Sequence, residues 1–246
     1  MDRRQFMASG SAAAVALAAE PVLARGAAVQ GDAALNATLD AVFQDGIAHS
    51  PEYATSLGLD KGKLAPLRSQ LSPATAAERA SDLARNQKWA RALTAINPAT
   101  LTATGKRNRA LAQYMLEQRS LAARDFGLDS VQRPYRLFQQ GGAYFEIPDF
   151  LNSQHTINSA ADAEAYLSRL SAFARVLDED TAEQKAQSAR GFTAPGWSID
   201  LTLGQLAKLR GPAAADSGMV QSLASRAKAK GVAGDWAARA AKIVES

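Results

Sequence analysis

The two histidines are the first residues to consider for chemistry, because the chain has no cysteine. Structural and catalytic zinc sites are built from Cys, His and carboxylate ligands, and a His-Glu-x-x-His helix places two of them one turn apart. Neither His49 nor His155 belongs to such a motif. We therefore expect no catalytic, cofactor-binding or metal-binding residue in this chain. His49 is expected near a helix end, and His155 is expected to be a hydrogen-bonded loop residue.

Serine and carboxylate patterns are equally incomplete. Residues 196–200 (Gly-Trp-Ser-Ile-Asp) begin like a nucleophile elbow but lack the second glycine and a preceding strand. Ser225 and Lys228 have the Ser-x-x-Lys spacing, without the companion segments of that motif. The acidic run at 178–183 lies on one predicted helix, whereas paired-carboxylate catalysis needs opposing carboxylates across a cleft. We interpret this run as a solvated helix face.

Composition narrows the class of protein further. The chain has 246 residues, 47% of them hydrophobic, which is enough for a sizeable core in one domain. The net charge of +4 is spread over scattered positions such as 106–109 and 226–230. A nucleic-acid-binding protein needs a denser basic stripe, so no nucleic-acid partner is predicted. Without cysteine, an exported form would depend on packing alone for its stability.

The first 24 residues have the order of a secretory signal. Arg3 and Arg4 precede Phe6, a small-residue apolar stretch follows, and residues 22–24 (Val-Leu-Ala) resemble a signal-peptidase site. The arginine pair favours the twin-arginine route, with cleavage after Ala24. The translocase and signal peptidase are then the expected partners during export, and the location is periplasmic or extracellular. The alternative, a membrane anchor, needs about 20 apolar residues, and the run is much shorter.

The remainder predicts an all-α protein: a linker over 25–31 and a multi-helix domain over 32–246. Capping residues, prolines in first turns and closing glycines mark the helix limits. One amphipathic face is clear at Tyr166, Leu170, Phe173 and Leu177. The expected helices cover about 32–49 (with Asp32 as its cap), 51–57, 73–96, 104–126, 159–190, 195–209, 219–230 and 235 onward.

The segment 131–158 breaks this pattern. It combines Gly and Pro residues with five aromatics, so we expect an ordered loop with one or two short helical turns, packed against the helices. The aromatics are interpreted as core residues, with the lining of a cleft as the alternative.

The same segment carries a family resemblance. Residues 135–142 (YRLFQQGG), 147–151 (IPDFL) and 162–170 (DAEAYLSRL) resemble a large bacterial family first catalogued as a domain of unknown function. Residues 50–59 and 191–195 are similar to further landmarks of that family. Its full-length members look like zincin-type metallopeptidases of about twice this length. The resemblance implies an all-α fold and carries over no functional residue, because the family's zinc helix lies downstream.

Two hypotheses follow. In the first, this chain is the N-terminal helical region of an exported metallopeptidase, inactive by itself and without its zinc-binding catalytic partner region. In the second, it is a stand-alone periplasmic binding or scaffold protein. The apolar stripe of Trp236, Ala240, Ile243 and Val244 favours the first, because we expect part of its partner surface to lie outside these residues.

Overall fold

The computed structural model describes residues 30–245. The signal residues Arg3, Arg4 and Phe6, the cleavage site at Ala24 and most of the predicted linker lie outside the described residues. Residues 30 and 31, assigned to the linker from the sequence, are already helical.

The described residues are helical with no strand, which confirms the all-α prediction. A first helix covers residues 30–48. The others are α2 (Pro51–Ser56), α3 (Ala76–Ala95), α4 (Ala103–Leu121), α5 (Ala143–Ser153), α6 (Ala160–Ala189), α7 (Gly196–Arg210), α8 (Gly218–Ala229) and α9 (Trp236–Glu245). Short 3-10 helices occupy η1 (Gly62–Ser69), η2 (Pro98–Thr100) and η4 (Ala214–Asp216), and η3 (Ala122–Phe126) is a π-helical turn. No described helix is long and apolar enough to span a membrane.

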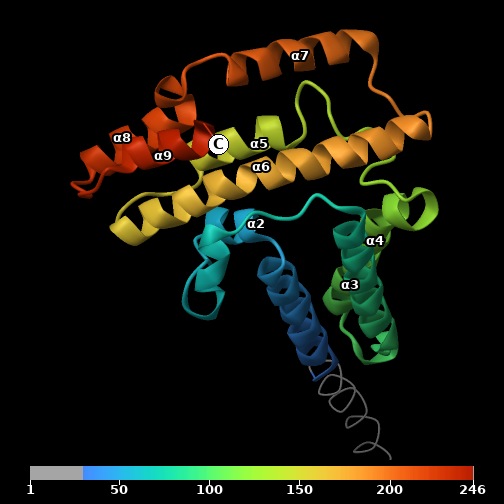
Figure 1. Cartoon of the computed structure of the whole chain (residues 1–246). Coiled ribbons are helices and arrows are strands. Elements are labelled where there is room, and N and C mark those ends of the chain that lie inside the picture. Colours follow the sequence, from blue (N-terminus) through green and yellow to red (C-terminus); the bar gives the residue numbers. More distant parts are fainter. Residues whose placement is uncertain (1–29, 246) are drawn as a thin grey trace, which may run out of the picture. The chain divides into compact units, whose positions relative to one another are not determined.

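The described residues form two compact units, the first of which comprises residues 30–43 and 83–121. In its described part, Leu35, Leu93, Leu101 and Leu116 form the core. The paired green helices α3 and α4 are visible in Figure 1. They are joined where the Arg109 guanidinium donates to the carbonyls that end α3, at 2.8 and 3.1 Å. This unit has the smaller of the two cores.

The second unit comprises residues 44–82 and 122–245 and contains the larger core. Its axis is the 30-residue helix α6, along which α5 lies, with α8 and α9 paired beside it (Figure 1). Tyr166, Leu170 and Phe173 are buried as the amphipathic pattern predicts. The Tyr166 hydroxyl donates to the Met219 carbonyl at 2.8 Å, which satisfies its polar end within the core.

The loop expected over 131–158 is a prediction that the structure corrects. Its second half is α5, an eleven-residue helix with Pro148 inside it. Proline in a helix removes one hydrogen bond and costs about 3 kcal/mol. Tyr144, Ile147 and Leu151 are buried on one face of α5, and each such side chain contributes roughly 1.5–3 kcal/mol. Burial of this face therefore outweighs the local penalty.

Helix limits elsewhere agree with the sequence to within a few residues. Gly58, Gly127 and Gly191 all have positive φ just after helices, as helix-closing glycines require. Ser159 caps α6 by accepting from the Asp162 amide at 3.2 Å. Asp32 does not cap its own helix. It accepts from the Thr102 amide at 3.0 Å and thereby supports the start of α4.

The last helix finds most of its partner surface inside the second unit. Trp236 and Ala240 are buried in the core that α6 and α8 share, so the expected unpartnered stripe is wrong for these two residues. Val244 is 36% exposed and Ile243 is partly buried. Their side chains line a groove that is described below.

Candidate functional site

Arg169 of α6 is fully buried at the centre of the second unit. Its Nε donates to the Gln70 carbonyl at 2.8 Å, and its Nη2 donates to the Thr55 hydroxyl at 2.8 Å and the Leu67 carbonyl at 3.0 Å. Its Nη1 lies 2.8 Å from Nδ1 of His155. Burial lowers the pKa of Arg169 to about 10, so the side chain remains cationic at neutral pH. The guanidinium fixes α2, η1 and α6 to one another.

His155 is held as a neutral ring by the same contact. An arginine can only donate, so Nδ1 of His155 accepts and Nε2 carries the proton, which it donates to the Asp162 carbonyl at 2.9 Å. Burial, together with the positive charges of Arg169, Arg68 and Arg226, lowers the pKa of His155 to about 4. Both ring nitrogens are occupied. His155 is therefore a structural residue of the core rather than a ligand or a base.

The acidic run at 178–183 is not the solvated face that its sequence suggests, because Asp180 and Glu183 are buried. Asp180 accepts from Nε of Arg136 and from the Ala143 amide, both at 2.5 Å, and so caps the start of α5. Glu183 pairs with Arg79 and accepts from the Gln187 amide at 3.0 Å. Each carboxylate is matched by an arginine far away in the sequence, and this pairing could not be predicted from the helix alone.

Helix α7 turns its polar side inward. Ser198 and Thr202 are its buried residues, and the Ser198 hydroxyl donates to the Gln139 side chain. The Tyr144 hydroxyl lies 2.8 Å from the Gln205 side chain. Ser198, considered above as an incomplete nucleophile elbow, is thus a hydrogen-bonded anchor of this helix.

The apolar residues of α7 face outward as a result. Trp197 is 60% exposed and Leu201 is 53% exposed, on the side opposite to the groove. On the groove side, Ile199, Leu203, Leu206 and Arg210 follow the i, i+4, i+7, i+11 spacing of one helix face. A helix with a polar buried side and two apolar exposed sides is the reverse of an ordinary surface helix.

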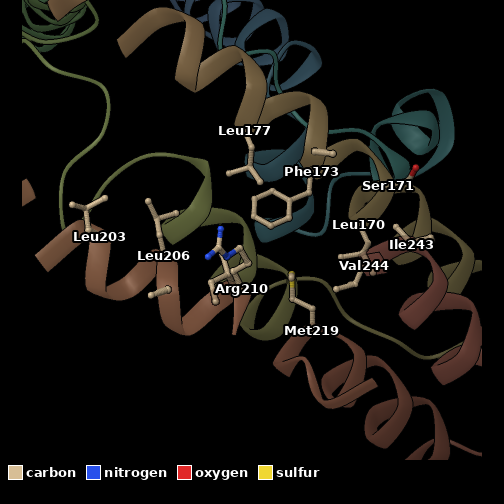
Figure 2. Close-up of a pocket in the computed structure, with 13 residues that line it drawn as sticks. Leu170, Ser171, Phe173, Leu177, Leu203, Leu206, Arg210, Met219, Ile243 and Val244 are labelled. Atoms are coloured by element: carbon tan, nitrogen blue, oxygen red, sulfur yellow. The ribbon is translucent and has the colours of Figure 1, made fainter. Parts of the chain in front are cut away.

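The groove lies between this face of α7 and α6, α8 and α9 and has a volume of about 630 Å³. Leu170, Phe173 and Leu177 of α6 project into it, and Leu203, Leu206 and Arg210 of α7 face them, as Figure 2 shows. Size and lining are those of a small-molecule pocket, mostly apolar with few polar groups. The remaining lining residues are Ser171, Ala174, Ala207, Leu209, Met219, Ile243 and Val244.

The other residues considered from the sequence, His49 and Ser225, do not come together in a site. His49 is exposed directly after the first helix, where its Nδ1 lies 2.8 Å from the Asp45 carbonyl. The Ser225 hydroxyl donates to the Gln221 carbonyl at 2.7 Å, as on an ordinary helix surface. Within residues 30–245, no group of three or more His, Asp or Glu side chains is placed to hold a metal ion. Tyr144 and Phe150 are core residues, as expected of the aromatic segment, while Phe145 is 41% exposed.

Residues 51–246 match the family described as "Bacterial protein of unknown function (DUF885)". The chain belongs to this family. No curated protein matches it. It is also similar to the crystal structure of "the putative lipoprotein from Colwellia psychrerythraea", with a TM-score of 0.76 and 14% sequence identity.

The likeness covers 88% of this chain and 38% of the Colwellia chain. This chain thus spans less than half the length of that protein. At 14% identity the likeness establishes the shared helical fold and carries no residue role.

The groove is the functional feature that inspection of the sequence missed. The stripe on 199–210 was a detectable signal, because its spacing is helical and it ends in a cation. The second wall comes from residues 170–177, and only the folded structure brings the two together.

Proposed function

We propose that this chain is the helical, non-catalytic region of an exported zincin-like metallopeptidase of the family. In this proposal the outer face of α7, defined by Trp197 and Leu201, docks the zinc-bearing region of the longer family proteins. The supporting observations are the family match over residues 51–246 and the reversed polarity of α7. The reversed helix is the single observation that carries the proposal.

A docking role accounts for the energetics of α7. Leaving Trp197 and Leu201 in water forgoes roughly 1.5–3 kcal/mol for each side chain that a partner could bury. Meanwhile Ser198 and Thr202 occupy the inward positions, where apolar residues would ordinarily contribute to stability. A second protein surface over the outer face would recover that burial. Aromatic and aliphatic anchors of this kind are typical of interface centres.

Export is the second part of the proposal. Arg3, Arg4 and Phe6 would direct the chain to the twin-arginine translocase, and signal peptidase would cut after Ala24. The folded protein would then act in the periplasm or outside the cell. Zinc would belong to the longer protein, since no metal ligand set occurs among the described residues of this chain.

The alternative function is a stand-alone periplasmic binding or scaffold protein. The groove beside α6 favours it, because its volume of about 630 Å³ is that of a ligand pocket. Binding without catalysis needs no metal and no nucleophile, which suits the occupied hydrogen bonds of His155 and Ser198.

The test starts from the protein as the source cell makes it. An antiserum raised against residues 30–245 should detect a chain much longer than 246 residues, and the purified species should contain one zinc ion and hydrolyse peptides. The 246-residue chain produced by itself should do neither. Detection of only the short chain, without zinc, would establish the stand-alone alternative.

A matched pair of variants tests the docking face within the longer protein. Trp197→Glu places a charge on the face and should reduce peptidase activity and expose the chain to proteolysis between its regions. Tyr114→Glu changes a residue on α4 that is 61% exposed and should leave both properties unchanged. Equal behaviour of the two variants would contradict the docking role.

A further inference from the structure

The guanidinium of Arg210 lies at an apolar surface without a counter-ion. Arg210 ends α7 and lines the groove, and Figure 2 shows its nitrogens between the side chains of Leu206 and Phe173. Its side chain makes no hydrogen bond or ion pair with any residue that the structure describes. Arg210 is exposed at the rim of the groove, whereas the more buried Arg136 and Arg169 both donate to acceptors. Arg210 is thus free to bind an anion.

The rest of the groove offers only apolar contact. Its walls are the Leu170–Leu177 stripe of α6, the Leu203–Leu206 stripe of α7, and Met219, Ile243 and Val244. Ser171 is the other polar residue in the lining, and its side chain lies on the far side of the view in Figure 2 from Arg210. A ligand that fits must therefore be apolar along its length and anionic at one end.

We propose that this groove binds an amphipathic carboxylate, with its alkyl chain between α6 and α7 and its carboxylate on Arg210. Charge complementarity requires an anionic headgroup, and a carboxylate meets this requirement because a guanidinium binds it in a fixed bidentate geometry. The site is distinct from the outer α7 face of the proposed function, and it does not depend on that function.

The dimensions favour an alkyl chain over a peptide. Seven residues separate Leu170 from Leu177 and Leu203 from Arg210, which corresponds to about 10 Å of wall, or two helical turns. A helix of two turns is only marginally stable in water, and an extended peptide would bring unpaired amides against Leu and Phe side chains. An alkyl carboxylate has neither cost. Burial of its alkyl carbons removes apolar surface from water and so favours binding.

The experiment uses decanoate, 1-decanol and acetate as probes, titrated calorimetrically at pH 7.5 into a protein that consists of residues 25–246. Decanoate stays below its micelle concentration. It should bind with one molecule per chain, 1-decanol should bind at least tenfold more weakly, and acetate should show no heat of binding. Absence of saturable decanoate binding, or several molecules per chain, would overturn the proposal.

Variants separate the headgroup contact from the alkyl contact. Arg210→Met should weaken decanoate at least tenfold and leave 1-decanol unchanged, while Lys208→Met, the same charge change two residues earlier, should leave both probes unchanged. Leu206→Glu should abolish binding of both, and Leu111→Glu on α4 should not. An equal loss for Arg210→Met and Lys208→Met would show that only net charge matters, which would refute the assigned contact.

The test also covers occupation of the groove by protein. If a second copy of the chain fills the groove, light scattering will show a dimer that Leu206→Glu converts to a monomer, and decanoate will not bind. That result would overturn the proposal. A monomer that binds decanoate through Arg210 supports it, whether or not the longer metallopeptidase exists.

Discussion

Acidification should destabilise the second unit through His155. The ring is fully buried and neutral, with Arg169 donating to Nδ1, and its pKa is lowered from 6.5 to about 4. The unfolded chain therefore binds more protons than the folded chain between pH 6.5 and about 4. In that window the free energy of unfolding decreases as pH falls. Protonation in the folded state would place a second cation against Arg169 and remove its acceptor.

The magnitude follows from the two pKa values. A difference of one pKa unit corresponds to 1.36 kcal/mol, so the full effect, reached below pH 4, is roughly 3 kcal/mol. Between pH 7 and pH 5 the loss should be about 2 kcal/mol. Folded domains are stable by about 5–15 kcal/mol, so a change of this size is readily measured. Above pH 7 the contribution of His155 should be constant.

Urea denaturation at several pH values provides the assay. Trp89→Phe in the background removes the tryptophan of the first unit, so that fluorescence reports on Trp197 and Trp236 of the second unit. His155→Asn keeps an acceptor for Arg169 and removes the titrating ring. The loss of unfolding free energy between pH 7 and pH 5 should therefore be about 2 kcal/mol smaller in this variant than in the parent. His49→Asn makes the same substitution at the exposed histidine and serves as the control. If the His155→Asn variant retains the parent slope, the argument from burial is wrong.

Three further predictions concern export and the core of the second unit. Arg3→Lys combined with Arg4→Lys should block export, and normal export of this double variant would exclude the twin-arginine route. N-terminal sequencing should show that the exported parent protein begins directly after Ala24. Arg169→Met should reduce the free energy of unfolding by about 3–5 kcal/mol in urea titrations, because several buried acceptors lose their donor, and a loss below 1 kcal/mol would contradict its central role. Gly142→Ala should cost about 1–3 kcal/mol in calorimetric melting, since φ is 101° there and a Cβ would lie 2.7 Å from Leu137, whereas Gly204→Ala within α7 should be neutral or stabilising.

Signals between neighbouring residues were enough to predict most of the helices correctly. Pro51 in a first turn, Ser159 as a cap and the positive-φ glycines after helices act over four or five residues, so their signals are complete within the sequence. The apolar period of α6 was sufficient to identify its buried face. These features depend on neighbouring residues and need no knowledge of the fold.

Helix α5 shows where local signals fail. Pro148 and the Gly141–Gly142 pair predict a loop, and they are counteracted by Asp180, which accepts from the Ala143 amide across 37 positions of the chain. Burial of Ile147 and Leu151 in the core that includes α6 completes the compensation. The sequence contains these residues, but nothing local indicates that they meet.

The buried polar groups and the groove were decided by tertiary structure alone. Asp180 and Glu183 follow the pattern of a solvated face. Their burial is stable because Arg136 and Arg79, from distant segments, form ion pairs with them that offset the cost of desolvation. His155 is neutral because α6 places Arg169 against it. The sequence by itself determined the helical class, the family and the lack of a local metal motif. Which polar groups are desolvated, and where a cation lies beside an apolar wall, depend on contacts between helices far apart in the chain, so they appear only in the folded protein.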